Sequence, residues 1–197
     1  MAKERLKSPR ARLFVALDLP TDVRKAIVEW QRAELTDEAL RVVRPENLHI
    51  TLAFLGYLQE KAISSVAEVL HTTEAAAPLI ELQRKAVGRP KSRPSLIAID
   101  AVSEATVALQ ADLERKLVAE RLYKPEKRSF WSHLTVARVR PERRGSKRPA
   151  RVERWPGELP AALCEAIFAD RLTLYRSSLR PQGAEYAPLA QVELPAD

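Results

Sequence analysis

The chain has 197 residues, and 46% of them are hydrophobic, which is enough for one domain with a buried core. Its 33 Lys and Arg residues outnumber the 26 Asp and Glu residues, and the formal net charge of +7 favours anionic partners such as nucleic acid. The single cysteine, Cys164, excludes an intramolecular disulfide framework and is typical of a reducing compartment, so we expect a cytoplasmic location. Residues 1–19 contain no apolar run long enough to span a bilayer, and we expect neither a signal peptide nor a membrane anchor.

Strand and helix patterns alternate in the first half of the chain. In chain order, this half predicts a strand over 12–17, a helix from Thr21, a strand over 48–55 and a helix over 61–73. Thr21 is expected to cap the first helix, in which Val23, Ile27 and Trp30 recur at helical spacing and form one apolar face. Gly56 is expected to end the second strand.

Strand patterns dominate the second half. In chain order, it predicts strands over 80–87 and 96–100, a helix over 105–120, and strands over 130–139, 164–174 and 185–194, the last two joined by a turn at 181–183. Residues 140–155 are rich in Arg, Lys and Pro and predict a loop. Strands joined by short turns cannot be parallel, so the expected fold class is α+β, with a mostly antiparallel sheet and outer helices. The recurring strand-helix-strand order favours two lobes with internal pseudo-symmetry.

Two of the three histidines occur in the same local pattern. Residues His49–Leu52 read His-Ile-Thr-Leu, and residues His133–Val136 read His-Leu-Thr-Val. In a strand, residues i and i+2 point to the same face, so each imidazole lies beside a hydroxyl while the aliphatic residues point into a core. One such motif alone would more often be a half-buried histidine with a satisfied hydrogen bond. The repetition favours two motifs that face each other across a groove.

A pair of imidazoles and hydroxyls suits a tetrahedral phosphate. Hydrolysis of a cyclic phosphodiester needs a base for the attacking water and an acid for the leaving oxygen, and histidine with a pKa near ~6.5 can serve as either. The Thr51 and Thr135 hydroxyls can donate hydrogen bonds to the non-bridging oxygens. Neither motif carries a further ligand at metal-binding spacing, so we expect no metal and no cofactor. The third histidine, His71, is expected to be a solvated helix residue, and Cys164 is not expected to be a nucleophile.

Three stretches extend this pattern over nearly the whole chain. They are the opening strand Arg12–Pro20, the first motif with its flanks Val43–Gly56, and the closing Leu174–Leu179 with Gly183, Tyr186 and Leu189. With these stretches the chain resembles the RNA 2′,3′-cyclic phosphodiesterases of the two-histidine phosphoesterase superfamily, also called 2′-5′ RNA ligases. The second motif departs from the family pattern, because Phe130-Trp131-Ser132-His133 lacks the proline that usually precedes the histidine.

The resemblance implies a single bilobal domain over 1–197, with two mostly antiparallel sheets, one motif per lobe and the active-site groove between them. It implies His49 as proton donor and His133 as proton acceptor, without a metal, in opening RNA 2′,3′-cyclic ends to 2′-phosphomonoesters. The same two histidines would also join a 2′,3′-cyclic end to a 5′ hydroxyl, which implies weak 2′-5′ ligation. Arg138 fits the family's basic residue near the phosphate. We also expect a monomer.

Further RNA contacts are expected around the second motif. Arg128 is a candidate for pairing with phosphate oxygens, and Phe130 is a candidate for stacking on a base, although it fits equally well as a core residue. The basic loop 140–154 is either a track for the RNA backbone or solvated surface. Two alternative functions stay open: action on another cyclic nucleotide or a 2′-5′ oligonucleotide, and a basic RNA-binding module without catalysis.

Overall fold

The computed structural model describes residues 9–180 and 183–195. The helices of this part are α1 (Thr21–Glu34), α2 (Ala62–His71) and α3 (Glu104–Ala119). The strands are β1 (Arg10–Asp18), β2 (Leu40–Val42), β3 (His49–Gln59), β4 (Leu79–Arg89), β5 (Leu96–Val102), β6 (His133–Val139), β7 (Ile167–Phe168), β8 (Arg171–Arg180) and β9 (Gly183–Glu193). Single 3-10 turns occur at Pro45–Asn47 and Ala161–Leu163. None of the described helices is both long enough and apolar enough to cross a membrane.

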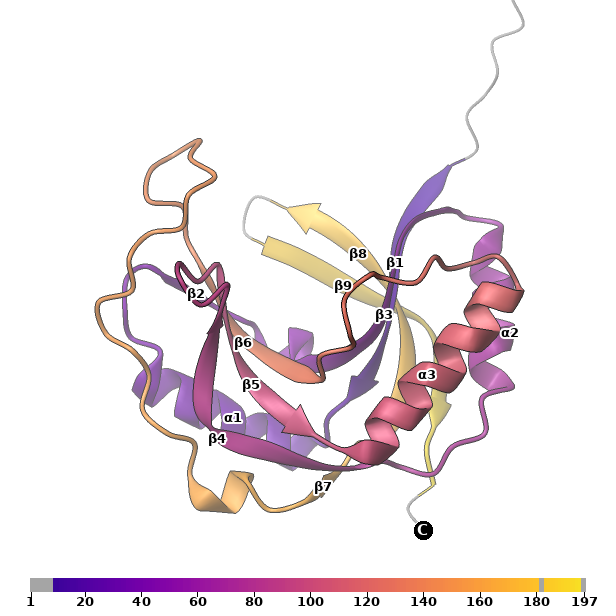
Figure 1. Ribbon diagram of the computed structural model, residues 1–197, viewed down its shortest axis with the longest axis horizontal. Helices are drawn as coiled ribbons and strands as arrows, with labels where there is room; N and C mark the ends of the chain where they lie inside the picture. Colours follow the sequence, from indigo (N-terminus) through magenta and orange to yellow (C-terminus); the bar gives the residue numbers. More distant parts are fainter. Residues whose placement is uncertain (1–8, 181–182, 196–197) are drawn as a thin grey trace, which may run out of the picture.

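The strands form one curled antiparallel sheet in the order β7-β4-β5-β6-β3-β1-β8-β9, with β2 beside β6 (Figure 1). Helices α2 and α3 contact each other at one side of this sheet, and α1 lies apart from them (Figure 1). The expected α+β class and antiparallel pairing are therefore confirmed. Two separate sheets related by a pseudo-two-fold axis are not confirmed, because β3 and β6 connect the two halves into a single hydrogen-bonded path.

The two halves of the sheet meet at the two histidine motifs. The register between β3 and β6 consists of one residue pair, Ile50 opposite Leu134, and both side chains are fully buried. On each strand the neighbours of this pair are the motif histidine and threonine, which point to the other face of the sheet. The aliphatic positions thus form the core of the junction, and the His and Thr side chains lie on its open face.

Both motif strands contain a β-bulge immediately after the threonine. The partner register shifts by one residue at Leu52 on β3 and at Val136 on β6. Because a bulge inserts one unpaired residue, the next side chain on the open face comes five positions after the histidine instead of four. That residue is Phe54 on β3 and Arg138 on β6, and the seven-residue burial patterns from the two histidines are identical.

Three boundary predictions differ from the structure. Gly56 does not end its strand: it has a φ of +69° beside the irregular pairing at Leu13 and Phe14, and β3 continues to Gln59. The helix α1 does begin at Thr21, but Pro20 is the capping position and no side chain caps the helix. The strand predicted from residue 130 begins only at His133, because β6 pairs with β5 from that residue.

The strand predicted over 164–174 is wrong. Residues 161–163 form a 3-10 turn, β7 pairs with β4, and β8 pairs with β1. Because β4 and β1 lie at different places in the sheet, the chain must change partners between Phe168 and Arg171 and cannot remain one strand. In the turn predicted at 181–183, residues 181 and 182 lie outside the described residues, and β9 starts at Gly183.

Candidate active site

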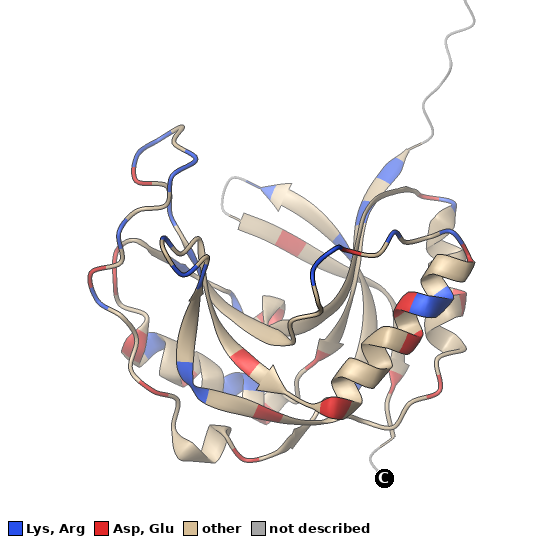
Figure 2. Ribbon diagram, in the orientation of Figure 1, with Lys and Arg blue, Asp and Glu red and all other residues tan. Residues whose placement is uncertain are grey.

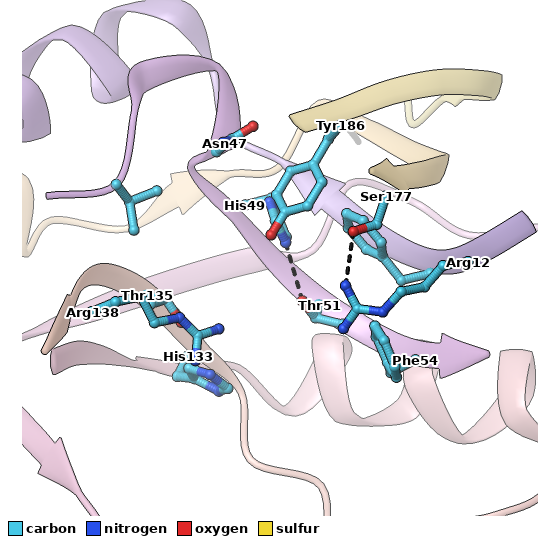
Figure 3. A pocket seen from close by; sticks show the side chains of 12 residues that line it. Arg12, Asn47, His49, Thr51, Phe54, His133, Thr135, Arg138, Ser177 and Tyr186 are labelled. Atoms are coloured by element: carbon cyan, nitrogen blue, oxygen red, sulfur yellow. Dashed lines mark hydrogen bonds between the residues drawn. The ribbon is translucent and has the colours of Figure 1, made fainter. Parts of the chain in front are cut away.

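The open face of the β3–β6 junction forms a pocket of about 150 Å³ (Figure 3). Both motif histidines and both motif threonines line it, together with Arg138. The remaining lining residues, which the sequence did not single out as site residues, are Arg12, Phe14, Val43, Asn47, Phe54, Ser177 and Tyr186. Figure 3 shows His49 and Thr51 on one strand and His133, Thr135 and Arg138 on the neighbouring strand. The structure thus brings the two motifs together around one small space.

Aromatic rings enclose the imidazole of His49. The Phe14 ring lies 4.9 Å from it between centroids, and the Tyr186 ring meets it edge-on at 5.3 Å. Tyr175 stacks on the other rings of this group, 5.1 Å from Phe14, and its hydroxyl donates a 2.7 Å hydrogen bond to the buried carboxyl of Asp18. The ring stack is therefore anchored to the core, which fixes the position of His49.

The same enclosure makes His49 a weak base in the free protein. Its pKa is lowered to about 4, mainly by burial; a backbone hydrogen bond at Asn47 favours the protonated form, and positive charge at His133 and Arg138 opposes it. Its Nε2 lies 3.1 Å from the hydroxyl oxygen of Thr51. At neutral pH the imidazole of the free protein is uncharged.

A different set of contacts holds His133. Its Nδ1 donates a 2.7 Å hydrogen bond to the backbone carbonyl of Trp131, which leaves Nε2 without the ring proton when the imidazole is neutral. The indole ring of Trp131 stacks on the imidazole with centroids 3.8 Å apart and 12° between the planes. The indole Nε1 in turn donates a 2.7 Å hydrogen bond to Asp100, and the Arg89 guanidinium lies 4.9 Å from the Trp131 ring.

These surroundings also lower the pKa of His133. Burial is the main cause, and the charges of Arg138 and Arg89 act in the same direction. The carbonyl of Trp131 and the negative charge of Asp100 partly offset them by favouring the imidazolium. The free protein therefore presents two neutral imidazoles at pH 7, and His133 is the less strongly perturbed of the two.

Two arginines bring positive charge to the pocket. Arg138 comes from the face of β6 that the bulge exposes, and burial followed by the charges of Arg41 and Arg12 lowers its pKa without removing its charge at neutral pH. Arg12 comes from β1: its guanidinium lies 4.5 Å from the Phe54 ring centroid and donates a 2.9 Å hydrogen bond to Ser177. Among the described residues no carboxylate lines this pocket, so its net charge favours an anion.

The donor set around the pocket differs from that of a metal centre. Within residues 9–180 and 183–195 there is no group of three or more His, Cys, Asp or Glu side chains that could hold an ion. The pocket itself offers two imidazoles, the hydroxyl groups of Thr51, Thr135, Ser177 and Tyr186, and two guanidinium groups. Such a set can exchange protons with a bound phosphate and donate hydrogen bonds to it.

Other residues singled out in the sequence lie away from the pocket. Arg128 is 87% exposed and pairs with Glu126 at 3.1 Å, and Phe130 packs against the core and lines no described pocket. Loop residues 140–154 also line neither described pocket. His71 is exposed at the end of α2, as expected, and burial raises the pKa of the Cys164 thiol, which is unfavourable for a nucleophile.

Known proteins with similar sequences and structures were compared with this chain. The model of the LigT-like phosphoesterase family matches residues 17–98. An RNA 2′,3′-cyclic phosphodiesterase of Methanocaldococcus jannaschii is 29% identical over 89% of this chain and 96% of its own length. One of Archaeoglobus fulgidus is 30% identical over 66% of this chain and 73% of its own length. A crystal structure of a Thermus thermophilus protein superposes with a TM-score of 0.77 at 27% identity, covering 94% of this chain and 99% of that one.

The matches extend over both motif strands and not only over the first. The family model covers β3, whereas the Methanocaldococcus relative and the Thermus structure span nearly the whole chain, including β6. Together with the two histidine motifs around one pocket, they show that this chain belongs to the LigT-like family of two-histidine phosphoesterases.

Proposed function

We propose that this protein hydrolyses the 2′,3′-cyclic phosphate at the 3′ end of RNA to a 2′-phosphomonoester, with His49 as general acid and His133 as general base. The observation that carries the proposal is the convergence of two imidazoles, two hydroxyls and two arginines on one pocket of about 150 Å³. This volume is well below the ~300 Å³ at which typical small-molecule sites begin, and it suits a phosphate group alone. The names of the similar enzymes support RNA as the substrate.

The proposed reaction is one in-line displacement at phosphorus. Nε2 of His133 takes a proton from water, and the water oxygen forms a bond to phosphorus. The bond from phosphorus to the 3′ oxygen breaks, and His49 gives its proton to that oxygen as it leaves. The ribose then carries a free 3′ hydroxyl and a 2′ phosphate.

Hydrogen bonds to the non-bridging oxygens would stabilise the charge that grows there in the transition state. The Thr51 and Thr135 hydroxyls and the guanidinium groups of Arg12 and Arg138 are the available donors. The aromatic enclosure of His49 excludes water from one side of the pocket, and such exclusion strengthens every one of these charge interactions.

The low pKa of His49 fits an acid that becomes protonated only when the anionic substrate is bound. A phosphodiester carries one negative charge, and an anion beside an imidazole favours the charged form and raises its pKa. In the free protein, burial and positive neighbours keep His49 unprotonated, whereas the bound anion would offset both effects. The proposed acid is therefore loaded in the complex. The assignment of acid and base to these two residues follows the family likeness.

The proposal includes chemistry without a metal ion and slow 2′-5′ joining, in which a 5′ hydroxyl takes the place of water, bonds to phosphorus and displaces the 3′ oxygen. The test is multiple turnover of a cyclic-ended oligonucleotide in excess EDTA. His49→Ala and His133→Ala should each lower turnover by roughly two to four orders of magnitude. The matched control is His71→Ala, since His71 is an exposed histidine that lines neither described pocket. Loss of activity in EDTA, restored by one divalent metal, would refute the metal-free mechanism.

The product separates the remaining alternatives. Phosphorus NMR of the hydrolysed end should show a 2′-phosphomonoester, because the 3′ oxygen faces the acid. A 3′-phosphomonoester would keep the two-histidine chemistry but reverse the proposed pose, with the 2′ oxygen facing His49. If the protein turns over only other cyclic nucleotides or 2′-5′ oligonucleotides, these are its substrates and RNA with a 2′,3′-cyclic end is not. Binding of cyclic-ended RNA without turnover would instead indicate a non-catalytic RNA-binding module. The monomeric state remains a prediction.

A further inference from the structure

A second, larger cavity of about 480 Å³ adjoins the reaction pocket. The two share Arg12, Val43, Asn47, Arg138 and Tyr186 in their linings, so the cavities are continuous. The larger one extends between the segment that follows β2 and the β8–β9 hairpin. We call it the arginine groove, because Arg41, Arg44 and Arg180 join the two shared arginines along it. Figure 2 shows that basic residues gather on the loops at the upper side of the molecule, whereas acidic residues lie mainly on the helices and the lower side.

Three of the five arginines of the groove, Arg12, Arg41 and Arg138, form no ion pair among the described residues. Arg41 and Arg138 are direct partners in the antiparallel β2–β6 ladder, where facing side chains lie on the same side of the sheet and like charges repel. Among the described residues Arg41 forms no ion pair, and no Asp or Glu lines the groove. Arg44 and Arg180 form only exposed pairs, with Glu46 at 4.0 Å and Glu185 at 3.2 Å, and such pairs contribute little. The arrangement is costly unless an anion occupies the groove.

Volume separates the roles of the two cavities. The reaction pocket suits the phosphate under attack, whereas 480 Å³ lies within the roughly 300–1,000 Å³ of typical ligand sites and can take a nucleoside with a further phosphate. In RNA the next anionic group beyond the terminal nucleoside is the phosphodiester at its 5′ oxygen. The rim of the groove also offers apolar surface, since Leu179 is 67% exposed and Val42 is 39% exposed.

We propose that the arginine groove binds the phosphodiester on the 5′ side of the terminal nucleoside, so that the enzyme selects RNA ends over cyclic mononucleotides. This inference rests on the proposed function and adds the part of the substrate that is recognised away from the reacting phosphate. It assigns the RNA track to Arg41, Arg44 and Arg180 and not to the basic loop 140–154, whose residues line neither cavity.

The experiment compares kcat/KM for three substrates: 2′,3′-cyclic AMP, the same nucleotide with a 5′ phosphate, and a tetranucleotide with a 2′,3′-cyclic end. Wild-type kcat/KM should rise along this series, because each added phosphate near the groove provides charge-assisted hydrogen bonds. In the triple variant Arg41→Gln, Arg44→Gln, Arg180→Gln, the ratio of tetranucleotide to cyclic AMP should fall by roughly tenfold or more. The salt dependence of kcat/KM for the tetranucleotide should become shallower as well.

The control is a triple variant with the same loss of charge outside the groove. Arg143, Arg144 and Lys147 are exposed residues of the basic loop, and their replacement by Gln should leave the substrate ratio at its wild-type value. Fluorescence polarisation of a labelled cyclic-ended tetranucleotide provides a readout of binding that needs no turnover. The groove variant should bind it at least tenfold more weakly than the loop variant does.

Three results would overturn the inference about the groove. They are equal wild-type kcat/KM for all three substrates, an unchanged ratio in the folded groove variant, and an equal loss in the loop variant. A single Arg41→Gln substitution, at an exposed side chain, repeats the test if the triple variant melts at a lower temperature. Failure of the proposed function looks different: wild-type protein would hydrolyse none of the three substrates, while polarisation still reports whether the groove binds RNA.

Discussion

The low pKa of His49 predicts an acidic pH optimum for kcat/KM. This parameter follows the protonation of the free enzyme, and the proposed reaction needs one of the two histidines protonated and the other neutral. The pair holds a single proton between the lower pKa, that of His49 at about 4, and the higher pKa, that of His133, which burial lowers from 6.5. We therefore expect kcat/KM to reach its maximum between these two values and to fall about tenfold per pH unit above them.

The size of the effect follows from the lowered pKa. At pH 7, with a pKa of about 4, only about one free molecule in a thousand carries a proton on His49. Bound phosphodiester raises the pKa of both imidazoles, so the profile of kcat should lie at higher pH than that of kcat/KM. The two profiles should be measured from pH 4 to 9 on a cyclic-ended oligonucleotide.

NMR titration of the histidine ring protons tests the same reasoning without turnover. His49 should titrate near pH 4 in the free protein and at higher pH with saturating inorganic phosphate. Titration of His49 at or above 6.5 in the free protein would refute the argument, because burial and positive neighbours would then not control its charge.

Five substitutions test the contacts around the site and the fold beneath it. Thr51→Val and Thr135→Val should each weaken transition-state stabilisation by on the order of 1 to 3 kcal/mol, mainly in kcat, and unchanged kinetics in both would mean that the hydroxyls do not touch the phosphate. Asp100→Asn removes a charge that raises the pKa of His133, so the alkaline limb of kcat/KM should move to lower pH; a move to higher pH would contradict the assignment. Trp131→Phe keeps a ring on His133 but removes the hydrogen bond to Asp100, and kcat should fall by roughly tenfold with little change in KM. A rise in KM with unchanged kcat would instead indicate that Trp131 contacts the substrate. Gly56→Ala should cost about 1 kcal/mol of unfolding free energy, measured by denaturant titration, because φ is +69° and nothing lies within 4 Å of the added Cβ; no change would mean that the backbone relaxes there.

Local patterns were sufficient to predict the helices and most strands. Helical spacing identified the segments that became α1, α2 and α3, and alternation identified both motif strands with the correct inward and outward residues. The failure at 164–174 has a physical cause. An apolar run shows that a segment is buried, but it does not show that the chain exchanges one neighbouring strand for another within that run.

The site was predictable where its residues follow one another in the chain. His49, Thr51, His133 and Thr135 share their pocket because strand geometry places i and i+2 on one face. Arg138 was reached through the family resemblance, since strict alternation would turn the fifth residue after His133 away from the pocket.

The pocket residues that lie far from the two motifs in the sequence could not be identified from any local sequence pattern. Arg12 and Tyr186 come from β1 and β9, far apart in the chain, and only the strand order β3-β1-β8-β9 brings them to the pocket of His49. Similarly, the departure from the family pattern lay in the missing proline before His133, and the hydrogen bond of Trp131 to Asp100 had no signal because it depends on the pairing of β5 with β6.

The repeated bulge explains how two similar strands supply different groups to one pocket. On β6 the residue exposed after the bulge is Arg138, a cation that lines the pocket directly. On β3 the equivalent residue is Phe54, which carries no charge, yet the guanidinium of Arg12 lies over its ring at 4.5 Å. Each motif strand therefore positions one guanidinium. The strand β3 holds that of Arg12 through the cation–π contact with Phe54, and β6 carries Arg138 itself. The two cations approach the pocket from different strands, and this arrangement suits a phosphate whose two non-bridging oxygens point in different directions.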